Sequence, residues 1–342
     1  MTELGTRPTV SVVIPVRDEA ARLPEVIANV AAQSVRPDEV IVVDGASTDG
    51  TRPWLAERAA KNPSWLVVVD NPRRVVPAAL NLGLAAASGD LVARMDAHAD
   101  YPPDYLERVT GLLAARPDVT GVGGAMTTAG RGAWGRASAA VLSRRIGLGG
   151  ARHRVGGRGG PIVHVFTGCY RRDALLAAGG YDERLLANED YEMDHRLRAA
   201  GGVLWLHPAA RSTWYVRATP GATARQMYRY GFYKALTLRL HPRSLRVRQL
   251  APPALLVAFA GLGALAPRIT GYPVAAFAAA YLAGCAVAGA RAARADGASA
   301  WRGALVPPLV HLSWGAGVLA GGARFLRTGP AVARRVHAGP RG

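Results

Sequence analysis

Short apolar runs alternate with helical stretches from residue 9 to about residue 215, and this alternation constrains the fold more than any other feature. The first runs are typical of strands and lie at 10–15, 40–43, 66–69 and 91–95. The stretches between them are typical of helices and lie at 20–33, 53–61 and 77–87. Strands that take turns with helices predict an α/β fold with a mostly parallel sheet.

Three apolar stretches follow this pattern, at 252–266, 273–290 and 304–322. Each is near the lower bound for crossing a hydrocarbon core of ~30 Å. A buried helical core is the alternative, but an α/β domain does not need so long an apolar extension, so we expect C-terminal membrane helices. Three full crossings would place the Arg-rich C-terminus opposite the α/β domain, against the positive-inside tendency. The third stretch is therefore expected to be re-entrant or interfacial.

Charge and cysteine usage exclude several classes of protein. The net charge of +18 comes almost wholly from arginine, and these residues are scattered along the chain, which argues against nucleic-acid binding. Cys169 and Cys285 lack the spacing of a zinc site. The N-terminus shows no secretory signal pattern, so the α/β part is expected to stay in the cytosol.

Two carboxylates follow predicted strands, and ligands of such sheets gather beyond the carboxyl ends of the strands. Asp44 comes after the run VIVV and opens the turn DGASTDGT. It is either a turn and capping signal or a carboxylate that hydrogen-bonds a nucleotide base or ribose. Asp96 and His98 come after the strand at 91–95 and, being two residues apart on an extended segment, point the same way. They are either turn and structural residues or ligands of one divalent ion that neutralises a diphosphate leaving group.

Two further groups of polar residues lie on predicted helices. Glu189 and Asp190 precede the helical pattern YEMDHRLRAAG, where Asn188 would cap the helix and the helix dipole favours acids. The same dipole keeps Asp190 ionised, as a general base requires, so both interpretations stand together. Gln226, Arg229 and Tyr230 share one helical face and form either a polar stripe or a site for phosphate and sugar.

Five segments, in this order, resemble glycosyltransferase family 2. They are SVVIPVRDEAARL, VIVVDGASTDGT, NLGLAAASGDLVARMDAHADYPPDYL, FTGCYRRDALLAAGGYDERLLANEDYEMDHRLRAAGG and QMYRYGFYK. The resemblance covers roughly residues 9–250 and is greatest to the branch involved in succinoglycan-type exopolysaccharide biosynthesis. It implies the Rossmann-like GT-A fold, a nucleotide-sugar donor, a Mg²⁺ or Mn²⁺ ion and an inverting displacement.

The resemblance also assigns the donor side of the site. Pro15 and Glu19 match the first-strand nucleotide motif, and Asp44 matches the acid that contacts the nucleoside. Asp96 and His98 stand where the family has its DxD metal motif, with Asp96 also close to the donor nucleotide. Because His98 replaces the second Asp, its imidazole shifts the expected metal toward Mn²⁺.

On the acceptor side, the resemblance makes Asp190 the catalytic base. Glu189 is expected beside the acceptor or diphosphate. Gln226, Arg229 and Tyr230 match the family's QxxRW motif and are expected to contact the acceptor or the diphosphate. Tyr230 replaces the Trp of that motif, which removes one reason to expect a processive polysaccharide synthase.

The expected protein is an inverting, metal-dependent hexosyltransferase that moves a sugar, from UDP by resemblance, to a hydroxyl of a lipid-linked or polysaccharide acceptor in exopolysaccharide or cell-envelope glycan synthesis. We expect a cytoplasmic catalytic domain at 1–225, an amphipathic interface segment at 226–250 and a membrane-associated helical region at 251–342. A polyprenyl-phosphate glycosyltransferase is the nearest alternative, and a non-catalytic membrane scaffold is another. A sugar-nucleotide pyrophosphorylase is disfavoured because VIPVRDEAARL lacks its glycine-rich phosphate loop.

Overall fold

The computed structural model describes residues 7–149, 151–155, 157–265 and 272–327. The described chain forms two compact units. The first contains Met1–Thr127 and Gly156–Trp214, and the second contains Thr128–Val155 and Tyr215–Gly342. These units are defined by packing, whereas the predicted division at 225 and 250 concerns function and stays a prediction.

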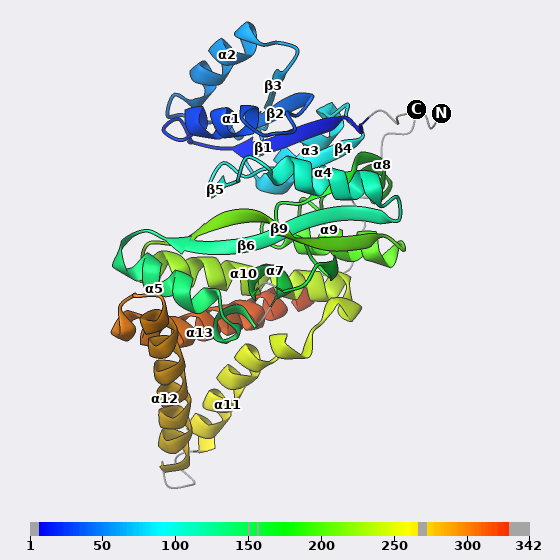
Figure 1. Cartoon of the computed structure of the whole chain (residues 1–342). Coiled ribbons are helices and arrows are strands. Elements are labelled where there is room, and N and C mark those ends of the chain that lie inside the picture. The colour runs from blue at the N-terminus through cyan, green and yellow to red at the C-terminus, as the bar shows by residue number, and fades with distance from the viewer. Residues whose placement is uncertain (1–6, 150, 156, 266–271, 328–342) are drawn as a thin grey trace. The chain divides into compact units, whose positions relative to one another are not determined.

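Four parallel strands form the first half of the sheet in the first unit (Figure 1). They are β1 (Val10–Val16), β2 (Glu39–Asp44), β3 (Leu66–Asp70) and β4 (Leu91–Arg94). Their order is β3-β2-β1-β4, with β2 and β4 on opposite sides of β1. The strand order therefore reverses between β1 and β4, which is where sheets of this kind bind their ligands.

Antiparallel strands complete the nine-stranded sheet. They are β8 (Cys169–Arg171), β6 (Val119–Gly130), β9 (Val203–Val216), β5 (Ala99–Asp100) and β7 (Gly160–Pro161). The sheet is thus mixed, and its parallel character lies in the N-terminal strands, as the alternation of strands and helices predicts.

Helices cover both faces of this sheet (Figure 1). One face packs against α1 (Leu23–Ala31), α2 (Thr51–Lys61) and α4 (Tyr105–Ala115). The other packs against α3 (Val76–Ala86), α8 (Arg172–Ala177) and α9 (Glu189–Ala199). Val12 and Val13 belong to the cores on opposite faces, and two-sided burial explains why the strand sequences are apolar throughout.

The second unit is helical. Its elements are α5 (Gly132–Leu142), α6 (Arg145–Leu148), α7 (Arg152–Val155), α10 (Pro220–Leu240), two short 3₁₀ turns (Pro242–Ser244 and Val247–Gln249), α11 (Ala251–Leu265), α12 (Tyr272–Ala295) and α13 (Ala300–Arg327). The Thr219 side chain accepts a hydrogen bond from the backbone of Ala222 and so caps α10. Both α12 and α13 are long and apolar enough to be candidate membrane spans.

Two local expectations need correction. Helix α1 begins at Leu23 rather than at 20, because Ala20 donates its N–H to Asp49 in the next loop instead of entering the helix. Asn188 stands at the N-cap of α9, but its backbone is left-handed with φ of 64° and its side chain makes no capping hydrogen bond. The Glu189 and Asp190 side chains still lie in the first turn, as predicted.

Candidate active site

The loops that follow β1 and β2 are hydrogen-bonded to each other. The N–H of Asp18 donates to Ser47 Oγ at 2.8 Å, and the N–H of Thr48 donates to Asp18 Oδ1 at 2.7 Å. The N–H of Glu19 donates to Thr51 Oγ1 at 3.0 Å, which fixes the backbone of this predicted nucleotide-binding residue. Both loops leave the carboxyl ends of neighbouring parallel strands, so they form one edge of the candidate site.

Asp44 ends β2 and is only 2% exposed. Its Oδ1 accepts a hydrogen bond of 2.5 Å from the Ser47 hydroxyl, so the carboxylate shapes the turn that follows the strand. Half-buried Pro15 lies in β1 opposite Val43, the residue before Asp44. The contacts of Asp44 are thus those of a turn residue. Its contact with a nucleoside stays a prediction.

A short turn after β4 presents Asp96 and His98. The N–H of Asp96 donates to the hydroxyl of buried Tyr101 at 2.9 Å, which closes the turn on itself. His98 Nε2 lies 4.0 Å from Asp96 Oδ2, with the His98 side chain 53% exposed and the Asp96 side chain 4% exposed. The two side chains lie close together, but on a turn and not on the extended segment that the sequence predicts, and their binding of a metal ion stays a prediction.

Arg94 connects this turn to α9. Its Nε lies 2.7 Å from Asp96 Oδ1 and its Nη2 lies 3.2 Å from Asp96 Oδ2, so it binds that carboxylate with two nitrogens. Its Nη1 lies 3.0 Å from Oε1 of Glu189. All three side chains are largely buried. Sequence reasoning missed Arg94, although an arginine two residues before Asp96 in an otherwise apolar strand is a usable signal.

The shared guanidinium gives the two carboxyls different protonation behaviour. Burial alone would raise the pKa of Asp96, but the charge of Arg94, helped by His98, holds that pKa below its ordinary value. Burial raises the pKa of Glu189, and the neighbouring charge of Asp190 raises it further despite Arg94. Asp96 is thus the anionic partner, and Glu189 is the carboxyl that holds a proton more readily.

Asp190 lies in the first turn of α9, where the N–H of Tyr191 donates to its Oδ1 at 2.7 Å. Its side chain is 26% exposed, unlike that of Glu189. The charge of Asp190 acts on Arg94, as do the charges of Asp96 and Glu189. Arg94 therefore brings the predicted metal residue and the predicted base into one neighbourhood.

A histidine lies between Asp190 and a second buried carboxylate. His164 Nε2 is 3.8 Å from Asp190 Oδ2, and His164 Nδ1 is 2.7 Å from Oδ2 of Asp194. Asp194 also accepts hydrogen bonds from the Val165 N–H at 2.8 Å and the Tyr170 hydroxyl at 2.9 Å. His164 and Asp194 were not found from the sequence; the four-residue spacing of Asp190 and Asp194 on one helix face was the available signal.

The remaining predicted residues lie on α10, in the second unit. Gln226 is buried, and its Nε2 donates to the Tyr230 hydroxyl at 3.1 Å. Arg229 is exposed on the same helix. Within the predicted QxxRW-like group, Gln226 and Tyr230 therefore contact each other, and the contact of the group with acceptor or diphosphate stays a prediction.

A divalent ion fits the Asp96–His98 pair only as a partial site. Over the described residues, no group of three or more His, Cys, Asp or Glu side chains is arranged to hold an ion. Asp96 and His98 offer one imidazole and one carboxylate, and both oxygens of that carboxylate also bind Arg94. A site with few protein ligands suits an ion that completes its shell with water and substrate phosphate oxygens.

The chain is similar in sequence to known glycosyltransferases. Residues 11–177 match the model of the family "Glycosyl transferase family 2". The chain is 35% identical over 281 residues to succinoglycan biosynthesis protein ExoA of Rhizobium meliloti (strain 1021), covering 79% of this chain and 83% of that protein. It is 38% identical over 116 residues, 33% of this chain and 36% of the relative, to undecaprenyl-phosphate 4-deoxy-4-formamido-L-arabinose transferase of Aeromonas hydrophila subsp. hydrophila.

A solved structure is similar in fold. The mannosyltransferase PcManGT from Pyrobaculum calidifontis, in complex with GDP-Man and Mn²⁺, superposes with a TM-score of 0.64 at 24% identity, covering 94% of this chain and 88% of that one. This similarity confirms the predicted GT-A fold. The family match and the long match to ExoA show that the chain belongs to glycosyltransferase family 2.

Proposed function

We propose that this glycosyltransferase moves a sugar from a nucleotide-diphosphate donor, a UDP-sugar, to a hydroxyl of a lipid-linked or polysaccharide acceptor, with inversion at the anomeric carbon. The observation that carries the proposal is the joining of Asp96, Glu189 and Asp190 around Arg94 beyond the switch point of the sheet. The similarity to ExoA supports an exopolysaccharide or cell-envelope glycan as the product.

Asp190 is the proposed general base. It is the more exposed of the two neighbouring acids on α9, and its carboxylate is held by the N–H of Tyr191. It takes the proton of the acceptor hydroxyl as that oxygen attacks the anomeric carbon. The nucleotide diphosphate leaves from the opposite face of the sugar, which inverts the configuration.

Asp96 and His98 would hold Mg²⁺ or Mn²⁺, which supplies positive charge against the diphosphate. The carboxylates in the site would otherwise repel that anion. Pro15, Glu19 and Asp44 are proposed to contact the nucleoside. Gln226, Arg229 and Tyr230 are proposed to contact the diphosphate or the acceptor, together with Glu189. These roles rest on the motif matches.

The protein is proposed to act at the cell membrane, attached by its C-terminal apolar helices, with its catalytic domain in the cytoplasm. A phosphate acceptor is the second candidate, since one relative is named as an undecaprenyl-phosphate sugar transferase. The label that mild acid releases from lipid after transfer from a UDP-sugar separates the two. A sugar on a lipid phosphate is released as a monosaccharide, whereas a sugar joined to the hydroxyl of a lipid-linked saccharide stays joined to that saccharide.

The donor and metal site predicts a metal-dependent thermal shift. A UDP-sugar added with MnCl₂ at about 100 times its Kd should stabilise the native protein by about 2.7 kcal/mol, and omission of MnCl₂ should remove most of that shift. Asp96→Asn should lose the shift, because it removes the charge that faces the ion. Asp118→Asn, in an exposed Arg-x-Asp ion pair, is the control. A full shift in Asp96→Asn would contradict the site, and thermal shift measurements over a set of nucleotide sugars decide the donor.

His164 is proposed to position Asp190 and not to touch the substrate. His164→Ala removes the group between Asp190 and Asp194, so we expect kcat to fall about 10–100-fold with little change in the KM for the donor. His164→Gln keeps a hydrogen-bonding group near Asp194 and should recover part of the rate. Steady-state kinetics measure the split. An unchanged kcat, or a loss confined to KM, would contradict this role.

A further inference from the structure

Helix α13 packs with its backbone against α10. A Cβ at Gly317 would lie 2.1 Å from the carbonyl oxygen of Tyr228, and one at Gly231 would lie 2.0 Å from the carbonyl oxygen of Trp314. At Gly321, the same atom would lie 2.3 Å from the Phe232 oxygen. Glycines on both helices therefore allow a contact that any side chain would block, and α13 is held along α10.

Helix α10 has the composition of a helix outside the hydrocarbon core. Its charged side chains are Arg225, Arg229, Lys234 and Arg239. Each such charge is costly at the centre of a bilayer. A helix that touches α10 backbone to backbone shares its depth, so the second half of α13 lies outside the core as well.

Polar contacts hold the beginning and middle of α13. His311 Nε2 lies 2.9 Å from the carbonyl oxygen of Ile146, and its Nδ1 lies 3.2 Å from the Tyr281 hydroxyl. Just before α13, Asp296 pairs with Arg144 at 2.8 and 2.9 Å. Arg144 and Ile146 belong to the arginine-containing segment at α6, whereas Tyr281 belongs to α12. The beginning and middle of α13 are therefore held by polar contacts to this segment and to the α12 side chain of Tyr281.

The opposite side of α13 is an apolar stripe. Its residues are Trp301, Leu305, Leu312, Leu319 and Leu326, spaced by four and then by seven, which places them on one face of the helix. Four of them are exposed: Trp301 at 62%, Leu305 at 50%, Leu319 at 42% and Leu326 at 82%. One polar-packed face and one exposed apolar face are what a helix lying in the membrane surface presents.

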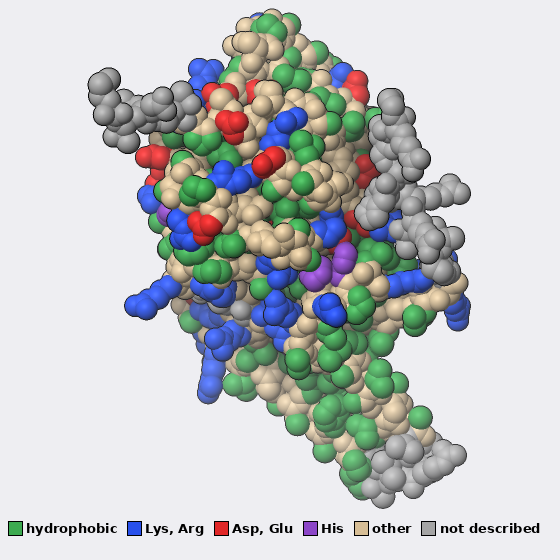
Figure 2. Space-filling view, turned by 90° about the vertical axis from the view of Figure 1, so that its right-hand side faces the viewer, with side chains coloured by type: hydrophobic (Ala, Val, Ile, Leu, Met, Phe, Trp, Pro, Cys, Tyr) green, Lys and Arg blue, Asp and Glu red, His purple; other side chains and the backbone are tan. Residues whose placement is uncertain are grey.

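Helices α11 and α12 differ from α13. They project together from the α10–α13 layer of their unit (Figure 1), and the coloured part of this projection in Figure 2 carries mostly hydrophobic and uncharged surface. The apolar window of α12 is only 11% buried. Its 24 residues reach about 36 Å at 1.5 Å per residue, enough for a hydrocarbon core of ~30 Å.

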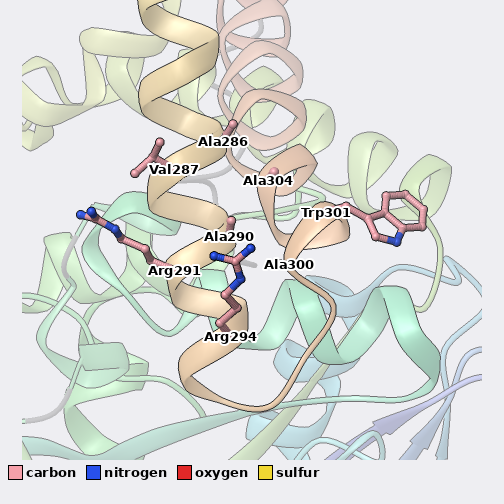
Figure 3. A pocket seen from close by; sticks show the side chains of 8 residues that line it. All are labelled: Ala286, Val287, Ala290, Arg291, Arg294, Ala300, Trp301 and Ala304. Carbon is pink, nitrogen blue, oxygen red and sulfur yellow. The ribbon is translucent and has the colours of Figure 1, made fainter.

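Basic and aromatic side chains mark the place where α12 meets α13. Arg291, Arg294 and Trp301 line a pocket together with four alanines and Val287 (Figure 3). Within the described chain, neither arginine has an acidic partner. Arginine and tryptophan at one end of an apolar helix are typical of the headgroup level of a membrane.

We infer that α11 and α12 enter the membrane together as a hairpin, while α13 lies along the surface from which they entered. The chain before α11 and the end of α13 are then on the same side of the bilayer. Arg324 and Arg327, in the last turn of α13, share that side with the catalytic unit, which agrees with the positive-inside tendency. The inference rests on the membrane attachment proposed above and assigns its topology.

Single cysteines in the full-length chain test this topology. The exposed positions are Ala60 in α2, Ala295 at the end of α12 and Ala323 in α13, each changed to Cys. The native Cys169 and Cys285 are buried, and the unsubstituted protein measures their background. A membrane-impermeant maleimide is applied to right-side-out and inside-out vesicles. All three variants should be labelled in the same vesicle type.

Two results would overturn the inference in different ways. Labelling of Ala323→Cys and Ala60→Cys in opposite vesicle types would show that α13 crosses the membrane, and membrane attachment would stand. Recovery of the protein in the soluble fraction would remove attachment and topology together. Neither result bears on sugar transfer, which the purified protein reports separately.

Discussion

Asp190→Asn should reduce sugar transfer by at least about 10²–10⁴-fold, the usual contribution of a positioned general base. The asparagine side chain has the same shape and its oxygen can keep the hydrogen bond of 2.7 Å from the N–H of Tyr191. It has no carboxylate to take the acceptor's proton. Donor binding should persist, because the predicted nucleotide residues Pro15, Glu19 and Asp44 are unchanged. Initial rates of transfer and the donor-dependent thermal shift measure the two effects.

Helix α8 offers a matched control for this substitution. Asp173 lies in the first turn of that helix, and its Oδ1 accepts a hydrogen bond of 2.7 Å from the N–H of Ala174, as Asp190 does from Tyr191. Asp173→Asn therefore makes the same change at a helix N-terminus without a proposed catalytic role, and it should transfer sugar at the normal rate. Full activity in Asp190→Asn would exclude Asp190 as the general base.

The parallel half of the fold could be predicted from the sequence because its strands are buried on both faces. Such strands are apolar without interruption, and the runs at 10–15 and 40–43 fall within β1 and β2. The antiparallel half has no comparable signal. Strands β5 and β7 contain two residues each and β8 contains three, too few for a recognisable period.

Residues of the candidate site could be predicted only where they lie at the end of a strand or in the first turn of a helix. Asp96 follows a strand and Asp190 lies in the first turn of a helix, so both can be found from the sequence. Arg94 and Glu189 meet across 95 positions of the chain, and His164 and Asp194 across 30. Contacts of that separation depend on the tertiary fold, and the local sequence does not show them.

The packing of α13 could not be predicted from its hydropathy alone. Its hydropathy makes it a candidate membrane span, since hydropathy averages the whole helix. The glycines at 317 and 321 occupy one face, and they are the sequence feature that indicates a close helix partner. Composition thus identifies an apolar helix, while the position of its small residues tells which face is covered by protein.

Arg94→Met should destabilise the first unit by about 3–5 kcal/mol, because it leaves buried carboxyls without their cation. Asp96 has a side chain that is 4% exposed, and Glu189 one that is 9% exposed. In the variant, Arg94 no longer opposes the effect of burial, so the pKa of both carboxyls should rise. A raised folded pKa means that lowering the pH neutralises the buried charges and restores stability, so the defect should shrink as the pH falls from 7 toward 5.

Arg116 provides the matched control, because it forms the same Arg-x-Asp pair on the surface. Its nitrogens lie 2.8 and 2.6 Å from the two oxygens of Asp118, but both side chains are largely exposed. Arg116→Met should therefore change stability far less, since exposed ion pairs contribute little. Thermal unfolding of the detergent-solubilised variants over this pH range makes the comparison. Equal losses in the two variants, or a defect in Arg94→Met that grows as the pH falls, would show that Arg94 does not balance a buried acidic pair.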